Sequence, residues 1–247
     1  MSSKEIFATI DLPGYPGESV VLAGEPEQVR NALRRGQAAV MVLNEETPSL
    51  DMEGIPYVVY ANDLPDIRYF QRVYERVKGI PGTVGETKRC ILREMVPTDG
   101  EAFLQLYRET PGARFLKDGC ETAEKWAAFI EDYRNHMYRF YEFGMWTVIL
   151  KETGEIIGRV GLSMGGNEGI PQLGYFIAAP WQRRGLALEV SLEVLRIAKE
   201  ELSLERLLLY TAPDNPASIK LAGKLGFLPA GRGEAEGCEV LRFERRL

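Results

Sequence analysis

Histidine and cysteine are scarce in this chain of 247 residues. His136 is the one histidine, and the three cysteines, Cys90, Cys120 and Cys238, lie far apart. This count excludes a histidine-rich metal centre, and we expect no metal ligands. A serine hydrolase would have to use His136, yet no G-x-S-x-G turn occurs in the sequence. Three distant cysteines indicate reduced thiols in a cytoplasmic protein and disfavour a disulfide framework or a zinc site.

Long apolar runs and an excess of basic charge are also missing. No stretch approaches the roughly 20 apolar residues of a membrane span, and the segment Met1–Ile6 lacks the apolar centre of a signal peptide. Thirty basic against 36 acidic residues give a net charge of −6, so we expect neither nucleic acid nor a membrane as a partner. With 45% hydrophobic and 27% charged residues, the composition is that of a soluble globular protein.

The first third of the chain predicts a small α/β module. Apolar runs and helical spacing indicate three strands and two helices, at Ser19–Leu22, Glu25–Arg35, Ala38–Leu43, Tyr57–Tyr60 and Leu64–Lys78. This order suggests a Rossmann-like fragment of unknown role. We expect Asp66 to cap a helix, because carboxylates at a helix start are more often caps than metal ligands. The Gly- and Pro-rich stretch Gly79–Gly85 predicts a linker, which divides the chain into domains at 1–85 and 86–247.

One stretch of the second domain combines three signals. An apolar strand includes Gly174–Ala178, and a basic turn follows at Gln182–Gly185. Helical spacing then starts at Ala187 and ends near Leu202. The first N–H groups of a helix have no intrahelical partners and attract anions, so this geometry can bind phosphate. An ordinary strand-to-helix connection with exposed arginines explains the same residues equally well. The turn matches neither the G-x-G-x-x-G fingerprint of dinucleotide folds nor a P-loop.

Two motifs in this domain resemble those of the GCN5-related N-acetyltransferases, the GNAT superfamily. Gln182-x-x-Gly185-x-Ala187 is similar to the family signature that binds the pyrophosphate of acetyl-CoA. Asn215-x-x-Ser218 followed by Lys224–Phe227 is similar to the segment after the family's fifth strand. The resemblance covers Lys88 to the C-terminus and is closest to the branch that acetylates ribosomal-protein N-termini. It implies an α/β (α+β) fold with a mixed, mostly antiparallel twisted sheet flanked by helices.

The resemblance also implies a site. The co-substrate would be acetyl-CoA and the acceptor an amine, a protein N-terminus or a small molecule, with a homodimer compatible with the family. Backbone groups of one strand would contact the pantetheine arm, at Phe176, Ile177 and Ala178. The basic turn would hold the pyrophosphate, with Gln182, Arg183, Arg184, Gly185, Leu186 and Ala187. Asn215 and Ser218 would lie beside the pantetheine and the thiol. The aromatic helical stretch Thr122–Tyr141 is most simply core, but in the family it walls the acceptor site, so that Tyr133, Tyr138 and Tyr141 could line it.

The acid and base positions depart from the family pattern. Many relatives carry Glu two residues before the strand's Gly-Tyr, where this chain has Gln172, and several carry Tyr where this chain has Ala222. Gln172 cannot accept a proton at neutral pH, although it could contact the acceptor. Ser218 is then a candidate proton donor, and Glu168 or a chain of water molecules is a candidate base. Two functions remain: an active N-acetyltransferase, or a CoA- or acyl-CoA-binding sensor or interaction module that has lost turnover.

Overall fold

The computed structural model describes residues 7–44, 51–115, 120–164, 169–235 and 237–247. The chain divides into two compact units, Met1–Gly82 and Thr83–Leu247. The division falls inside the stretch expected as a linker, but Thr83–Glu86 form a strand of the second unit.

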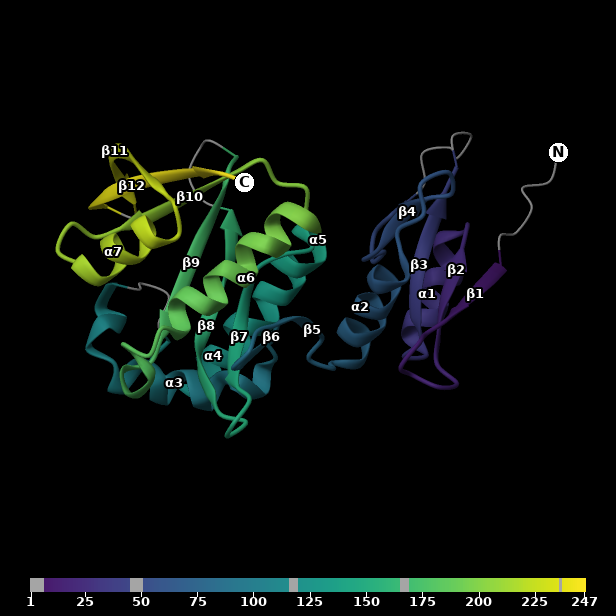
Figure 1. Ribbon diagram of the computed structural model, residues 1–247. Coiled ribbons are helices and arrows are strands. Elements are labelled where there is room, and N and C mark those ends of the chain that lie inside the picture. The colour runs from purple at the N-terminus through teal and green to yellow at the C-terminus, as the bar shows by residue number, and fades with distance from the viewer. Residues whose placement is uncertain (1–6, 45–50, 116–119, 165–168, 236) are drawn as a thin grey trace. The chain divides into compact units, whose positions relative to one another are not determined.

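The first unit is a four-stranded sheet with two helices (Figure 1). Its elements are β1 (Phe7–Asp11), β2 (Ser19–Ala23), α1 (Pro26–Arg34), β3 (Ala38–Leu43), β4 (Val58–Tyr60) and α2 (Ile67–Lys78). The strand order is β1-β2-β3-β4; β1 runs antiparallel to β2, and the other pairs are parallel. The expected strands and helices are confirmed with small shifts at their ends, and β1 is an additional strand.

Alternate residues of β2 and β3 face different helices, which explains why both strands are apolar throughout. Val20, Leu22, Val40 and Val42 pack with Phe70 and Val73 of α2, whereas Val21, Ala23, Ala39 and Met41 pack with Val29 and Ala32 of α1.

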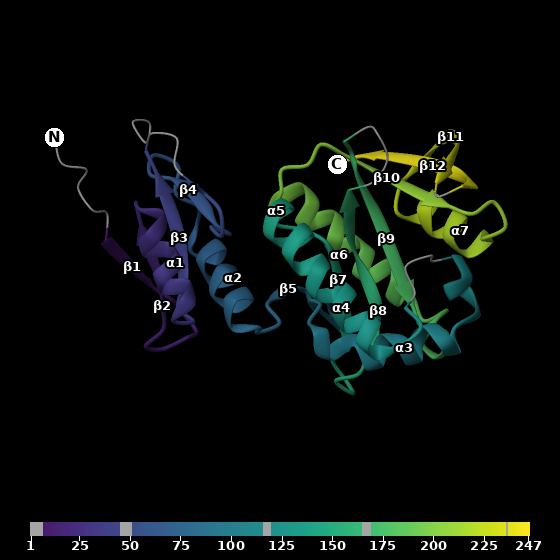
Figure 2. The same ribbon diagram turned by 180° about the vertical axis from the view of Figure 1, so that it is seen from behind.

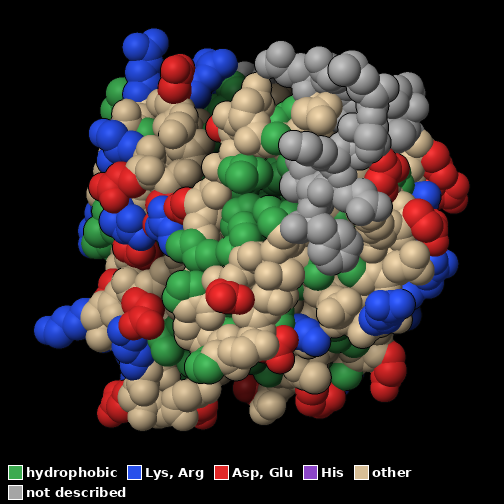
Figure 3. All heavy atoms as spheres, turned by 90° about the vertical axis from the view of Figure 1, so that its right-hand side faces the viewer, with side chains coloured by type: hydrophobic (Ala, Val, Ile, Leu, Met, Phe, Trp, Pro, Cys, Tyr) green, Lys and Arg blue, Asp and Glu red, His purple; other side chains and the backbone are tan. Residues whose placement is uncertain are grey.

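The prediction for Asp66 is confirmed, because its carboxylate accepts the Arg68 and Tyr69 amides at the start of α2. On the face in Figure 3, hydrophobic side chains gather near the middle, and charged side chains surround them.

The described residues of the second unit form an eight-stranded sheet in the order β11-β12-β10-β9-β8-β7-β6-β5. The strands are β5 (Thr83–Glu86), β6 (Cys90–Glu94), β7 (Met145–Leu150), β8 (Ile156–Met164), β9 (Pro171–Ile177), β10 (Arg206–Thr211), β11 (Leu228–Ala235) and β12 (Cys238–Arg246). Only the β9–β10 pair is parallel among these described strands. The mixed, mostly antiparallel sheet predicted for this part of the chain is confirmed.

Helices cover both faces of this sheet. The helices are α3 (Gly100–Glu109), α4 (Ala123–Tyr133), α5 (Arg139–Tyr141), α6 (Leu186–Glu200) and α7 (Pro216–Lys224), and a π-helical turn, Arg134–Tyr138, joins α4 to α5. Helix α6 crosses the face seen in Figure 1, and α3 and α4 cross the face seen in Figure 2. Between the layers lies a continuous hydrophobic core that includes Phe103, Trp126, Trp146, Val160 and Val194, each at most 1% exposed.

Candidate functional site

The candidate site starts where two parallel strands separate. Within the described residues, β9 and β10 share one register position, Gln172 with Leu208. Towards their C-terminal ends the two strands diverge, as Figure 2 shows. Beyond Gln172 their facing backbone groups are therefore not paired with each other in the sheet, and we call this divergence of the two strands the opening. Thr211, at the end of β10, is buried, and its hydroxyl has no protein partner among the described residues.

The backbone direction of β9 decides which amides face this opening. The Ala178 amide donates to the Ile157 carbonyl at 2.9 Å, and the register pairs Ile177 with Gly158 and Tyr175 with Val160. Amides in an antiparallel pair point alternately towards and away from the partner strand. Tyr175 and Ile177 thus direct their N–H groups away from β8. The expectation for Phe176 and Ala178 needs correction, because their amides face β8 and bond there.

A tight basic turn connects β9 to α6. Arg183 and Gly185 have φ of +60° and +77°, and Gly185 immediately precedes the helix without a side-chain cap. The first N–H groups of α6, at Leu186 and Ala187, have no carbonyl of the helix to bond. A turn with this backbone leaves donors for an anion. Gly185 is suited to its place because it adopts a positive φ without steric cost.

Two side chains of the turn are already engaged within the protein. Gln182 donates from Nε2 to the Ile177 carbonyl at 2.8 Å. The Arg184 guanidinium lies 4.8 Å from the centre of the Trp181 ring, a cation–π contact. The Gln182 side-chain amide is therefore engaged within the turn, whereas the cation–π contact leaves the N–H donors of the Arg184 guanidinium in place beside those of Arg183 and of the backbone.

The hairpin turn between β5 and β6 braces the start of α6. Glu189, in the first turn of the helix, accepts hydrogen bonds from the Thr87 hydroxyl at 2.7 Å, the Arg89 amide at 2.8 Å and the Arg89 Nε at 2.7 Å. Arg89 also donates from Nη1 to the Arg184 carbonyl at 2.9 Å. Burial alone would raise the pKa of Glu189, but these hydrogen bonds outweigh it and lower the pKa below its usual value. No local pattern in the sequence points to Arg89, since its partner Glu189 lies 100 residues away along the chain.

Helix α7 closes the other side of the opening. Asn215 caps it, because its Oδ1 accepts the Ser218 amide at 3.1 Å and Pro216 follows as the first helical residue. The Ser218 hydroxyl is buried and lies 2.7 Å from the hydroxyl of Tyr175 on β9. Burial raises the pKa of Tyr175, and the hydrogen bond to Ser218 lowers it by less. No motif points to Tyr175 either, although it follows Gly174 in the strand that leads to the basic turn.

The aromatic residues expected at an acceptor site divide into two groups. Tyr133 accepts the Met145 amide at 2.8 Å. Tyr138 accepts the Met95 amide at 3.1 Å and donates to the Met145 carbonyl. Both hydroxyls therefore hold the start of β7. Tyr138 is fully buried, which corrects the expectation that it lines an acceptor site, whereas Tyr133 is half-buried and its place at that site stays a prediction. Tyr141 is partly exposed beside the exposed Phe140.

The other predicted residues lie in different surroundings. Gln172 is half-buried at the point where β9 and β10 part. Glu168 lies outside the described residues. His136 is exposed and contacts the Asp132 carbonyl through Nδ1.

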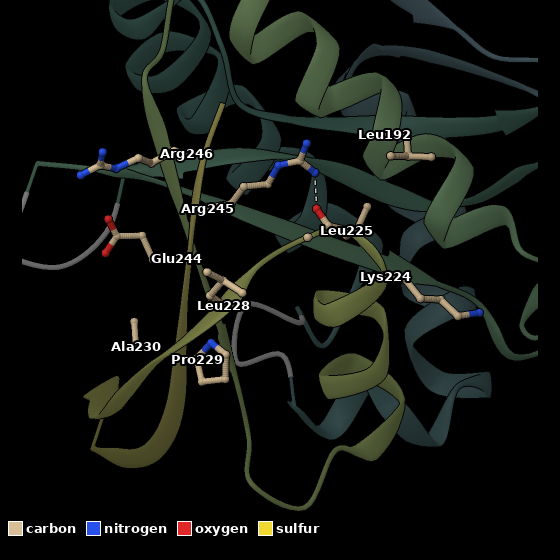
Figure 4. Close-up of a pocket in the computed structure, with 10 residues that line it drawn as sticks. Leu192, Lys224, Leu225, Leu228, Pro229, Ala230, Glu244, Arg245 and Arg246 are labelled. Atoms are coloured by element: carbon tan, nitrogen blue, oxygen red, sulfur yellow. Dashed lines mark hydrogen bonds between the residues drawn. The ribbon is translucent and has the colours of Figure 1, made fainter.

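A separate pocket of about 820 Å³ lies between α6, the C-terminal end of α7, β11 and β12. Figure 4 shows Leu192, Leu228 and Pro229 around it, and Arg245 donating to the Leu225 carbonyl. No residue predicted for the site lines this pocket. It is therefore distinct from the opening beside β9.

The described residues contain no group of three or more side chains that could hold a metal ion. Cys90, Cys120 and Cys238 lie in the described part of the chain and form no disulfide there. Among the described helices, none has the length and apolar character needed to cross a membrane.

Comparison with known proteins identifies the second unit. The model of the acetyltransferase (GNAT) domain family matches residues 89–228. The chain belongs to the GNAT acetyltransferases. An uncharacterized N-acetyltransferase of Bacillus subtilis, YoaA, is 28% identical over 148 residues, which cover 59% of this chain and 83% of that protein. The GNAT match includes the opening, the basic turn and the first turn of α7.

Solved structures share the fold of the GNAT unit. A putative ribosomal-protein-serine acetyltransferase from Vibrio cholerae aligns with a TM-score of 0.58 and 22% identity, covering 66% of this chain and 96% of its own. RimJ of Mycobacterium smegmatis, solved in complex with CoA-disulfide, aligns with a TM-score of 0.56 and 18% identity, covering 68% and 88%. At these identities the likeness concerns the fold. The family match and the similarity to YoaA show that this protein belongs to a family of acyltransferases.

Proposed function

We propose that this GNAT protein transfers an acetyl group from acetyl-CoA to a primary amine by direct attack in a ternary complex. The observation that carries the proposal is the opening between β9 and β10, bordered by the basic turn on one side and the first turn of α7 on the other. The CoA-disulfide complex of the RimJ neighbour supports a CoA ligand for this fold.

The residues around the opening fit such a ligand. The amides of Tyr175 and Ile177 would pair with the pantetheine arm, and the Thr211 hydroxyl is a further polar group at this edge. The N–H groups of Gly185, Leu186 and Ala187, with the Arg183 side chain, would hold the pyrophosphate. Each hydrogen bond to a charged group contributes on the order of 1.5–3 kcal/mol. Bound acetyl-CoA supplies the activated thioester, and the chain supplies binding, orientation and proton donors.

Tyr175 and Ser218 suit the role of proton donor to the departing thiolate. Their hydroxyls are 2.7 Å apart. When the Tyr175 hydroxyl donates to the Ser218 Oγ, the Ser218 hydroxyl can donate its own proton to the leaving sulfur. The raised pKa of Tyr175 keeps its proton in place at neutral pH. Tyr175 would thereby replace the tyrosine that other family members carry at the position of the buried Ala222.

The acceptor amine must arrive deprotonated or lose a proton at the site. Gln172 cannot take that proton, so Glu168 is the candidate base. An amine that is already neutral would need no base. The name of the Vibrio neighbour, a putative ribosomal-protein-serine acetyltransferase, favours a protein as the acceptor class to test first.

The decisive experiment measures release of CoA thiol from acetyl-CoA in the presence of N-terminal peptides and small amines, alongside calorimetric binding of acetyl-CoA. Thiol release that depends on one amine class, with the acetylated product found by mass spectrometry, is the expected result. Tight acetyl-CoA binding with no acceptor turned over would favour the alternative, a CoA-binding sensor or interaction module, for which Gln172 and Ala222 are the motivation. No binding at all would overturn both.

A further inference from the structure

Arg89 holds the peptide group between Arg184 and Gly185, just before α6. Its Nη1 donates to the Arg184 carbonyl at 2.9 Å. In a trans peptide the carbonyl and the following N–H point in opposite directions. The bond from Arg89 therefore turns the Gly185 N–H away from the guanidinium. An anion bound by this N–H would lie on the side of the peptide opposite to Arg89.

Arg89 also controls the charge at the start of α6. Glu189 is the acidic residue in the first turn of this helix, and an unpaired carboxylate there would repel a bound phosphate. Arg89 pairs with it through Nε and Nη2, both at 2.7 Å, and the Thr87 hydroxyl and the Arg89 amide bond the same carboxylate. The Glu189 side chain is thus held towards the β5–β6 hairpin, and its charge is compensated.

The guanidinium of Arg89 also lies close to Gly185. A Cβ at this glycine would stand 3.6 Å from the Arg89 Nη2. One side chain from the β5–β6 hairpin therefore contacts the peptide before the helix, the acidic residue of its first turn and the glycine between them.

We propose that Arg89 is a positioning residue for the CoA pyrophosphate: it orients the Gly185 N–H and neutralises Glu189, and so sets the anion affinity of the turn. This inference rests on the proposed function, since it concerns the same turn. A purely structural role is the competing explanation. In that case Arg89 would stabilise the fold without changing the preference of the site for ligands that carry pyrophosphate.

Calorimetric titration of the full chain with CoA and with pantetheine, which lacks the pyrophosphate, separates the two explanations. For Arg89→Ala we expect CoA affinity to fall about tenfold, equivalent to about 1.4 kcal/mol, with pantetheine affinity unchanged. Arg89→Lys should be intermediate, because lysine keeps the charge but cannot bond the carboxylate and the carbonyl as a planar fork. Arg89→Ala/Glu189→Gln should recover part of the loss, because the uncompensated charge is gone.

The matched control is Lys151→Ala, which removes a basic side chain that pairs with Glu86 of β5 at 2.8 Å and should leave CoA affinity unchanged. If Arg89→Ala binds CoA like the wild type, or loses CoA and pantetheine equally, the assignment is wrong. Should Arg89→Ala fail to fold, the Arg89→Lys titration decides by the same two criteria. A wild-type chain that binds no CoA would overturn the proposed function, and the assignment with it.

Discussion

At the scale of single residues, the proposed chemistry depends on the pair of hydroxyls that joins β9 to α7. Tyr175→Phe should lower kcat about tenfold or more, since a positioned proton donor typically contributes a factor of 10² or above. The KM for acetyl-CoA should stay nearly constant. The raised pKa of Tyr175 keeps its hydroxyl protonated well beyond pH 9, so the loss should be the same between about pH 6 and 9. Steady-state thiol release across that range measures both parameters.

A double-mutant cycle tests whether the two hydroxyls act together. If Tyr175 works through Ser218, then Tyr175→Phe should have little further effect in a Ser218→Ala background, because coupled residues are not additive. Additive losses would show that Tyr175 and Ser218 act separately.

Gly185 allows a second test at this scale, directed at binding. Gly185→Asp should abolish measurable acetyl-CoA binding, because the side chain adds strain at φ +77° and a negative charge beside the expected pyrophosphate. The matched control is Gly154→Asp, in the turn between β7 and β8, where φ is +74° and a Cβ would meet open space. Calorimetry should find wild-type affinity in the control. Wild-type affinity in Gly185→Asp as well would place the anion site elsewhere.

At the scale of elements, a row of glycines lets β7, β8 and β9 pack closely against their neighbours. Gly161 pairs with Met145 of β7 and with Gly174 of β9. A Cβ on Gly161 would collide with the Gly144 carbonyl, and one on Gly144 would collide with the ring of Tyr138. Since Tyr133 and Tyr138 also bond the backbone of Met145, these glycines allow the aromatic helix to fix the start of β7.

Gly161→Ala should therefore lower the free energy of unfolding by about 1–3 kcal/mol, the usual cost of an overpacked core. Gly223→Ala is the opposite control: this glycine lies inside α7 with nothing within 4 Å of its would-be Cβ, so alanine should stabilise by about 0.5–1 kcal/mol. Urea denaturation of both variants provides the comparison. An unchanged midpoint for Gly161→Ala would mean that the strands can move apart at no cost.

Local patterns predicted most elements of the fold and the outline of the site. The strand Ala38–Leu43 has the bounds that its apolar run indicates, because continuous burial leaves a continuous apolar run. The strand β5 was not predicted, because Thr83–Glu86 is short and contains Gly85, and so has no clear strand pattern. Its place in the sheet depends on pairing with β6 and on α6, about 100 residues further along the chain.

The contacts within the site could not be predicted from local patterns for a similar reason. The motif identifies the residues of the turn, but it does not show that Gln182 bonds back to Ile177. The alternation of amides along β9 depends on its register with β8, which the sequence does not specify. The Tyr175–Ser218 contact joins positions 43 residues apart and exists only because β9 and α7 meet at the opening.

At the scale of the whole molecule, the boundary of the GNAT family match and the boundary of the folded unit differ. The match begins at residue 89, whereas the second compact unit begins at Thr83. The residues between them include β5 and Thr87. Val84 packs against the hydrophobic core, Gly85 lies against Glu193 and Ile197 of α6, and Thr87 bonds Glu189 at 2.7 Å.

Two fragments test which boundary is the functional one. A Thr83–Leu247 fragment should keep the CoA affinity of the full chain, because it retains every contact of the basic turn described above. A Lys88–Leu247 fragment loses β5 and the Thr87 hydrogen bonds, each worth about 1 kcal/mol, so its melting temperature should fall by several degrees. Its CoA affinity should fall as well, because Glu189 is then less firmly held. Calorimetry and thermal melts of both fragments measure this. If Thr83–Leu247 binds CoA much more weakly than the full chain, then residues 1–82 contribute to the site; if Lys88–Leu247 binds as well as the longer fragment, β5 does not support the turn.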